Sequence, residues 1–213
     1  TTGAATIAQS TISVLPTSVE ADGSSISTIT LQAKDVNSND LTSGGLTIVF
    51  TQDGSASLDP GGVNDVGDGT YTQDITNTVA ETITISATLG GSLVTSGDPT
   101  INFTTGAATI AQSTISVLPT SVEADGSSIS TITLQAKDVN SNDLTSGGLT
   151  IVFTQDGSAS LDPGGVNDVG DGTYTQDITN TVAETITISA TLGGSLVTSG
   201  DPTINFTTGA ATI

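Results

Sequence analysis

Hydrophobic residues alternate with polar residues, mostly Thr and Ser, along much of the first 103 residues. In STITLQAK, Ile29, Leu31 and Ala33 occupy every second position, and ETITISATL repeats this spacing from Ile83 to Leu89. Alternation with a period of two is typical of β-strands that bury one face, whereas an amphipathic helix needs a period near 3.6. The pattern therefore predicts strands, and no segment favours a helix.

Seven segments of each repeat carry this strand pattern. They contain Ile12 and Val14, Ile29 to Ala33, Leu46 to Phe50, residues 55–58, Tyr71 to Ile75, Ile83 to Leu89, and Ile101 to Phe103. The runs between them, such as EADGSS, DVNSND and DPGGVNDVGDG, are rich in residues that favour turns. Seven short strands in about 100 residues are typical of an immunoglobulin-like β-sandwich. Because the Cys and Trp pattern of antibody domains is missing, we expect an all-β fold with an aliphatic core.

The chain is a tandem repeat. Residues 1–103 recur without change as residues 104–206, and the heptapeptide TTGAATI, which begins both copies, follows once more as residues 207–213. This period is far longer than the 20 to 50 residues of solenoid and propeller repeats, so each copy should be a domain. The trailing heptapeptide indicates a longer array.

Composition limits the function classes. The chain has 22 Asp and Glu but two Lys or Arg, for a net charge of −20. One repeat nevertheless holds 26 Ile, Val, Leu and Phe among 103 residues, which is enough for a folded core. Nucleic acids and anionic membranes need positively charged partners, so the composition argues against both. No apolar run approaches the roughly 20 residues of a membrane span, and no cleavable signal is present, so we expect a soluble, mature, monomeric fragment.

Several motifs together resemble a known family. The stretch INFTTGAATIAQSTISVLPTSVEADGSSISTITLQAKDVNSND combines an Ala/Gly turn, QST, a Pro, an AD-G-S-S loop, a Thr/Ile strand and a K-D-x-N turn, and DGTYT follows further on. This combination is similar to the bacterial immunoglobulin-like repeats of invasin/intimin-type or giant RTX-type surface adhesins. The resemblance covers nearly all of each repeat. It departs at Asn37-Ser38-Asn39-Asp40, where the family often has Asn-Gly.

The resemblance implies tandem immunoglobulin-like domains at the bacterial cell surface, outside the cell, strung between an outer-membrane anchor and a binding tip. On the family's register, domain 1 covers residues 8–106 and domain 2 covers residues 111–209. Residues 1–7 are then the end of a preceding repeat or linker, 107–110 the linker, and 210–213 the start of the next linker. The expected partners are neighbouring identical repeats of the same chain, and the expected role is that of a non-catalytic extender.

When the loops are assigned to the two ends of such a sandwich, many carboxylates are predicted to meet at the junction between domain 1 and domain 2. Glu20, Asp22, Asp53 and Glu81 would lie at one end of domain 1, and Asp138, Asp143, Asp162, Asp168, Asp171 and Asp201 at the facing end of domain 2. Two carboxylates about 4 Å apart repel by roughly 4 kcal/mol at an effective dielectric constant near 20. Without His or Cys, the available ligands are oxygens, which suit Ca²⁺. We therefore expect calcium to stiffen the loops and the junction.

The candidate calcium ligands are the acidic and Asn residues of the loops. They are Glu20, Asp22, Asp35, Asn37, Asp40, Asp53, Asp65, Asp68 and Asp98 in the first repeat, and Glu123, Asp125, Asp138, Asn140, Asp143, Asp168, Asp171 and Asp201 in the second. Residues 35–39 mimic the D-x-N-x-N start of an EF-hand loop. Asp40 replaces the required Gly and Leu46 the required Glu, so we reject an EF-hand. The alternative for all these residues is that they are metal-free turn formers.

Two other functions compete with the extender. A glycosidase would need a carboxylate pair, for which Asp65 and Asp68 are the candidates, but sugar sites normally add aromatic platforms and the chain is 3% aromatic. The Thr rows of TIT, TYT and TITIS could instead form a binding face for a glycan, a host receptor or ice. Thr is also a good strand former, so an ordinary outward sheet face gives the same pattern.

Overall fold

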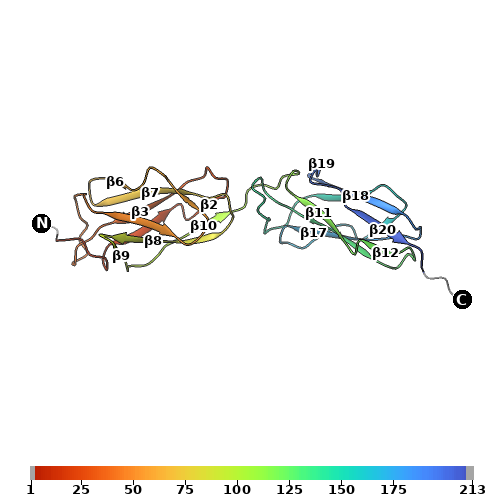
Figure 1. Ribbon diagram of the computed structural model, residues 1–213, viewed down its shortest axis with the longest axis horizontal. Helices are drawn as coiled ribbons and strands as arrows, with labels where there is room; N and C mark the ends of the chain where they lie inside the picture. Colours follow the sequence, from red (N-terminus) through yellow and green to blue (C-terminus); the bar gives the residue numbers. More distant parts are fainter. Residues whose placement is uncertain (1–2, 210–213) are drawn as a thin grey trace. The chain divides into compact units, whose positions relative to one another are not determined.

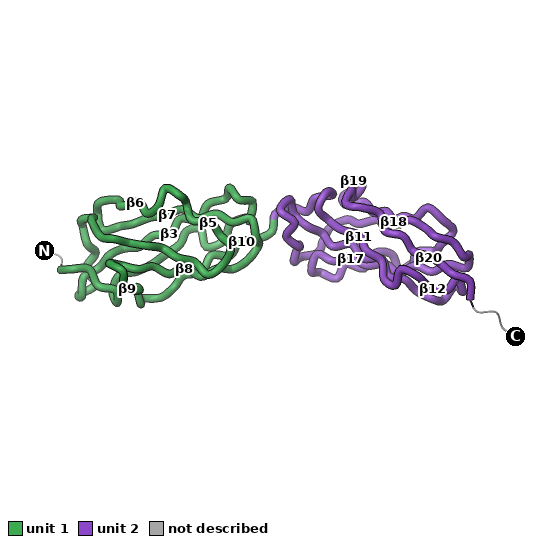
Figure 2. The backbone as a smooth tube through the Cα atoms, in the orientation of Figure 1, with its two compact units in different colours: residues 1–105 green, residues 106–213 purple. Residues whose placement is uncertain are grey.

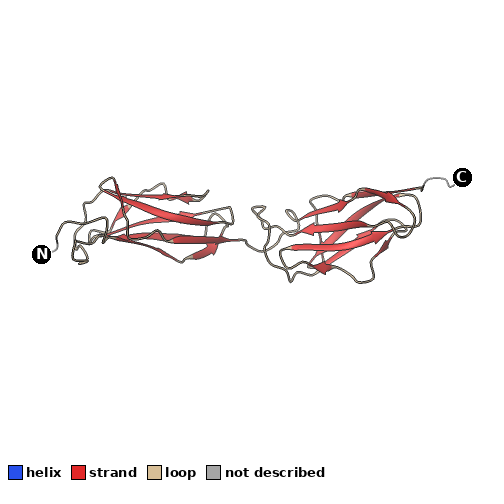
Figure 3. Cartoon of the chain, turned by 90° about the horizontal axis from the view of Figure 1, so that it is seen from below, coloured by secondary structure: helices blue, strands red, loops and turns tan. Residues whose placement is uncertain are grey.

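The computed structural model describes residues 3–209 and divides the chain into two compact units, Thr1–Thr105 and Gly106–Ile213 (Figure 2). Strands, turns and loops build both units, and the described residues form no helix (Figure 3). In particular, no helix among residues 3–209 is long and apolar enough to cross a membrane. The predicted all-β fold of tandem immunoglobulin-like sandwiches is confirmed.

The first unit contains ten strands (Figure 1). They are β1 Thr11–Leu15, β2 Ser18–Glu20, β3 Ser27–Gln32, β4 Ile48–Gln52, β5 Ser57–Leu58, β6 Asn64–Asp65, β7 Thr70–Thr76, β8 Thr82–Leu89, β9 Ser92–Leu93 and β10 Thr100–Thr104. Seven of them lie in the segments predicted from the sequence. The predicted strand at 55–58 is reduced to the two residues of β5, and Leu46 lies before β4.

The ten strands form two sheets. One has the order β1-β3-β7-β5, with β6 also paired to β7, and the other has the order β2-β10-β8-β4, with β9 paired to β8. All pairs are antiparallel except β2 with β10, which run parallel. This is the two-sheet arrangement of immunoglobulin-like domains.

The alternation of the sequence places one face of each sheet in the core. In β8, Ile83, Ile85 and Ala87 are fully buried, and Thr84 and Ser86 between them are half-buried on the outer face. The same alternation orders the other strands, so the inner faces of both sheets supply a single aliphatic core. This packing follows directly from the two-residue period of the sequence.

The structure adds three short strands that the sequence pattern did not predict: β2, β6 and β9. Strand β1 ends before Pro16, because a proline has no N–H to continue the ladder. The chain then crosses to the other sheet as β2, beside β10. Strands of two or three residues contain too few positions to show an alternation, which is why they escaped prediction.

The second unit repeats this architecture. Its strands are β11 Thr114–Leu118, β12 Ser121–Glu123, β13 Ser130–Gln135, β14 Ile151–Gln155, β15 Ser160–Leu161, β16 Asn167–Asp168, β17 Thr173–Thr179, β18 Thr185–Leu192, β19 Ser195–Leu196 and β20 Thr203–Thr207. Its sheets have the orders β11-β13-β17-β15 and β12-β20-β18-β14.

A tyrosine fixes the chain that leads into β4. The Tyr71 side chain is 1% exposed, and its hydroxyl accepts a hydrogen bond from the Leu46 N–H at 2.9 Å. Tyr174 and Leu149 make the same contact at 2.9 Å. We expect the double variant Tyr71→Phe/Tyr174→Phe to lose about 1–3 kcal/mol of unfolding free energy per unit, because the N–H groups lose their acceptors. Denaturant unfolding measures the loss.

A matched control changes an exposed residue in each unit. Val49 and Val152 are both 49% exposed, so Val49→Thr/Val152→Thr should stay within about 0.5 kcal/mol of the original chain. If the tyrosine variant unfolds at the same denaturant concentration as this control, the hydroxyl contact contributes nothing to stability.

Candidate functional site: the loop that holds the entering segment

The D-x-N-x-N motif forms a compact loop around one carboxylate. The Asp35 side chain is nearly buried, and it accepts hydrogen bonds from the backbone N–H groups of Asn37 at 2.9 Å and Asn39 at 3.0 Å. The Asn39 side-chain amide adds contacts at 3.1 and 3.2 Å. Ser38 adopts a positive φ of 65° to allow this closure. We refer to residues 35–40 as the Asp35 loop.

The Asp35 carboxylate also binds a segment far away in the sequence. The Gly3 N–H donates to Asp35 Oδ2 at 3.0 Å. With these bonds the acceptor capacity of the carboxylate is largely used, because two oxygens offer about four lone-pair positions. The motif that resembles the first half of an EF-hand loop therefore uses its Asp35 carboxylate to accept hydrogen bonds from backbone N–H groups.

Residues 3–7, which we call the entering segment of the first unit, are held at further points. The Thr6 N–H donates to the Lys34 carbonyl at 2.8 Å, and the Ile7 carbonyl accepts from the Thr95 N–H at 3.0 Å. The buried Ser10 hydroxyl donates to the Thr6 carbonyl at 2.7 Å. Ala5 packs against the core. The entering segment is thus part of the domain that follows it.

The second unit holds its own entering segment, residues 106–110, in the same way. Gly106 N–H donates to Asp138 Oδ2 at 3.2 Å, and Thr109 N–H donates to the Lys137 carbonyl at 2.8 Å. The Ile110 carbonyl accepts from Thr198 N–H at 2.9 Å, and Ala108 packs against the core. Residues 107–110, predicted to be the linker, are therefore bound to the second unit, and residues 3–7, predicted to be the end of a preceding repeat or linker, are bound to the first.

The stretch of chain between the last residue bound to the first unit and the first residue bound to the second unit is very short. The carbonyl of Thr104, the last residue of β10, accepts from the Ala21 N–H of the first unit at 2.8 Å. Gly106 is already bound to Asp138 of the second unit. A single residue, Thr105, separates the two.

Hydrogen bonds lower the pKa of both loop carboxylates. The bond from Gly3, followed by that from the Asn39 amide, lowers the pKa of Asp35 from its ordinary value of 3.8 to about 2. For Asp138, burial opposes ionisation, but the hydrogen bonds from Asn142, Gly106 and Asn140 outweigh it and the pKa is lowered. Both carboxylates are therefore charged at neutral pH.

The single Lys of each repeat lies beside this loop. Lys34 Nζ donates to Asp40 Oδ1, and Lys137 Nζ donates to Asp143 Oδ1. Asp40 and Lys34 also form a bridge between their backbones, which closes the loop. Because the chain has two basic residues, both of its cationic side chains are engaged here.

Most other predicted calcium ligands also close turns. Asp22 accepts from the Ser24 and Ser25 N–H groups, Asp53 from Thr84, Asp65 from Gly45 and Gly67, and Asp68 from Thr70. Asp125, Asp168 and Asp171 repeat these contacts in the second unit. Asp65 and Asp68 thus each serve a turn, as the turn-former alternative expects.

The structure disperses the remaining predicted ligands. Glu20 lies on β2 and Glu123 on β12, both exposed, and Asp98 and Asp201 lie in exposed loops. Within residues 3–209, no group of three or more Asp, Glu, His or Cys side chains could hold a metal ion. Calcium binding stays a prediction, and the described part of the chain offers it no assembled ligand cluster.

Sequence reasoning missed the residues that complete this site. Gly3 and Thr6, with Gly106 and Thr109 in the second unit, supply the N–H groups that the loop and its neighbours bind. The sequence carried no separate signal for these residues, because all 103 residues of the repeat recur unchanged, TTGAATI among them.

Comparison with known proteins gives the family. The chain belongs to the family described as invasin, domain 3, whose model matches residues 6–106 and again residues 109–209. Both repeats match over nearly their whole length, so the predicted resemblance to invasin-type adhesin repeats is confirmed.

Solved structures of adhesins share the fold. The Escherichia coli adhesin FdeC matches 99% of the chain at 23% identity with a TM-score of 0.67, and the chain spans 67% of that structure. Invasin, described as a bacterial integrin-binding protein, matches 96% at 24% identity with a TM-score of 0.66. Yersinia pseudotuberculosis InvD matches 94% at 28% identity with a TM-score of 0.59. The chain spans 41% of the invasin structure and 58% of the InvD structure.

Removing the loop carboxylate should release the entering segment. In Asp138→Ala, the N–H groups of Gly106, Asn140 and Asn142 lose their acceptor, so we expect their amide exchange to accelerate by roughly tenfold or more. Hydrogen exchange followed by NMR measures this change against the original chain, because peptides from the two identical entering segments have the same mass.

The control substitution lies in the same segment. Thr109 Oγ1 is buried without a hydrogen-bond partner among the described residues, so Thr109→Val should leave exchange unchanged. Equal acceleration in both variants would mean that the segment responds to any change and that the carboxylate has no special part.

The lowered pKa values predict acid sensitivity. Asp22 and Asp35 both have a pKa of about 2 in the folded chain, against 3.8 ordinarily. As the pH falls, the unfolded chain binds protons first, so their stabilisation is complete above about pH 5 and disappears progressively toward pH 2. Thermal melting between pH 7 and pH 2 should show a falling melting temperature in this window. A melting temperature that is constant from pH 5 to pH 2 would contradict the assignment.

Proposed function

We propose that the chain is a non-catalytic extender segment of a long bacterial surface adhesin. Each repeat adds length between the cell and a distal binding domain outside the cell. The observation that carries this proposal is the single residue, Thr105, between the last bond to the first unit and the first bond to the second. A linker this short suits a module that sets the distance between the cell and a distal domain, because few residues between the domains are free to move.

The repetition supports the same function. The two copies have identical sequences and therefore offer the same surface twice. A module that sets length gains from repetition, whereas a binding tip is needed only once. The family match adds that such repeats occur in adhesins. The sequence contains neither His nor Cys, and the acidic side chains that a hydrolase would need are used to close turns.

Calcium is a second part of the proposal. The chain offers oxygen ligands, and extracellular calcium modules bind at about 0.1–1 mM. An ion at ten times its dissociation constant would add about 1.4 kcal/mol per site. Because the Asp35 and Asp138 carboxylates are occupied by N–H groups, calcium would act at exposed carboxylates, such as those of Glu20, Asp98 and Asp201.

Small-angle scattering on two-repeat and three-repeat chains tests the extender. The eight residues of β8, the longest strand of the first unit, span about 26 Å at roughly 3.3 Å each, so with its loops one more copy should add about 30 Å to the maximum dimension. A smaller increase that follows the square root of length would indicate a flexible string and would contradict the proposal.

The same samples with millimolar calcium or with EDTA test the second part. A higher melting temperature in calcium is expected. Equal melting temperatures and equal maximum dimensions in both buffers would rule out the calcium part of the proposal and leave the extender function intact. Reproducible binding on a glycan array would favour a ligand-binding module instead.

A further inference from the structure

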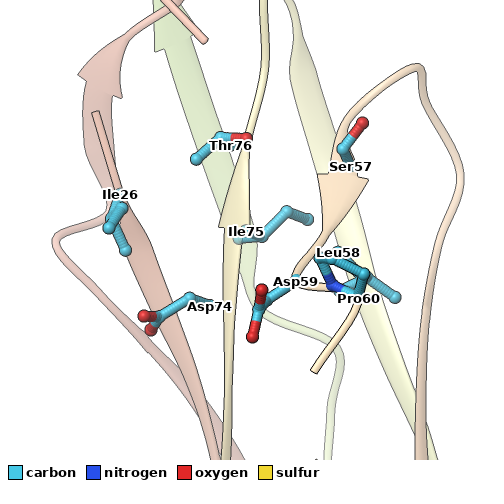
Figure 4. Close-up of a pocket in the computed structure, with 8 residues that line it drawn as sticks. All are labelled: Ile26, Ser57, Leu58, Asp59, Pro60, Asp74, Ile75 and Thr76. Atoms are coloured by element: carbon cyan, nitrogen blue, oxygen red, sulfur yellow. The ribbon is translucent and has the colours of Figure 1, made fainter. Parts of the chain in front are cut away.

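Each unit carries a small pocket on the outer face of its β1-type sheet. In the first unit its volume is about 270 Å³ (Figure 4), and in the second about 260 Å³. In the first unit the lining consists of Ile26, Ser57, Leu58, Asp59, Pro60, Asp74, Ile75 and Thr76. These volumes lie just below the roughly 300–1,000 Å³ of pockets for small organic molecules and are large enough for a single side chain.

Two carboxylates of like charge face this pocket from adjacent strands. The register Ser57↔Thr76 and Leu58↔Ile75 continues to Asp59 opposite Asp74, and the Asp59 N–H donates to the Asp74 carbonyl at 2.8 Å. Figure 4 shows both side chains, with Ile26 to one side and Leu58 and Pro60 to the other. Like charges directly opposite each other destabilise a sheet. Such a pair calls for a cation.

The chain does not supply that cation. Its two basic residues, Lys34 and Lys137, are engaged with Asp40 and Asp143. Asp74 Oδ1 accepts from the Thr28 hydroxyl at 2.7 Å, and the Asp59 carboxylate has no hydrogen bond among the described residues. Carboxylate oxygens are therefore available on both sides of the pocket.

The backbone holds Asp59 in this position. Its carbonyl accepts from the Gly62 N–H at 3.0 Å and from the buried Gln73 side-chain amide at 2.9 Å. Together with the bond to the Asp74 carbonyl, these contacts give the Asp59 backbone three hydrogen bonds, and Pro60 further restricts the backbone conformation of Asp59. A site that is already arranged loses little conformational freedom when it binds.

The apolar walls select the kind of cation. Ile26 is 50% exposed and the exposed Pro60 adds further apolar surface beside the carboxylates, whereas Leu58 lines the pocket but packs against the core. A bare metal ion gains nothing from such walls, whereas a lysine side chain buries its methylene stem along apolar surface and keeps its charge at the polar end. We propose that this pocket binds a lysine side chain of a basic partner peptide, once per repeat. This inference goes beyond the extender function.

A titration with a short, end-blocked lysine peptide at about 0.15 M salt tests the proposal by NMR. We expect amide shifts at Ser57, Asp59 and residues 74–76, with the same set in the second unit. The variant Asp59→Asn/Asp162→Asn should weaken binding about tenfold. Its melting temperature should not fall, because the substitution removes like-charge repulsion and no hydrogen bond of the side chain.

The control variant Asp98→Asn/Asp201→Asn removes the same charge from exposed loops and should bind as the original chain does. Ile26→Ser/Ile129→Ser should also weaken binding, since it removes an apolar wall. Equal weakening by both carboxylate pairs would show diffuse attraction to a chain of charge −20 and would overturn the proposal. Equal affinity of a side-chain-acetylated peptide, or the same shifts with calcium alone, would overturn it as well.

Discussion

Backbone N–H groups in loops need acceptors, and in this protein short carboxylate side chains supply them. Asp22 and Asp65 accept from their own turns, Asp53 accepts from Thr84 on β8, and Asp35 accepts from its loop and from Gly3. Each of these bonds gives a loop carboxylate a fixed backbone partner, and the partly buried Gly3 N–H would be costly to leave without an acceptor. Much of the acidic composition is explained by this task.

The same interaction makes the repeats continuous. In the second unit the Asp138 carboxylate takes the N–H of Gly106, directly after the last residue bound to the first unit and Thr105. Residues 3–7 and 106–110 are therefore part of the folded units, and the linker has almost no length of its own. A short linker suits the proposed extender, because every free residue between domains adds conformational freedom.

The sequence predicted the long strands and the core correctly, because alternation is a local property: Ile83 to Ala87 alternate in the sequence and are buried in the sheet. It missed β2, β6 and β9, which are too short to show a period. It also missed the contact between Gly3 and Asp35, which lie 32 residues apart, because the D-x-N-x-N motif does not indicate which distant residue its Asp binds. The sequence alone therefore could not show which candidate calcium ligands accept hydrogen bonds from the backbone.

We infer that the Asp138 carboxylate, together with the backbone bonds of Thr109 and Ile110, holds the entering segment of the second unit without metal. Nitrogen-15 relaxation of residues 106–110 in EDTA tests it most directly. The account predicts order parameters near 0.85, as in rigid backbone, for Gly106 and Thr109. Values below about 0.6 in EDTA that rise when calcium is added would contradict it.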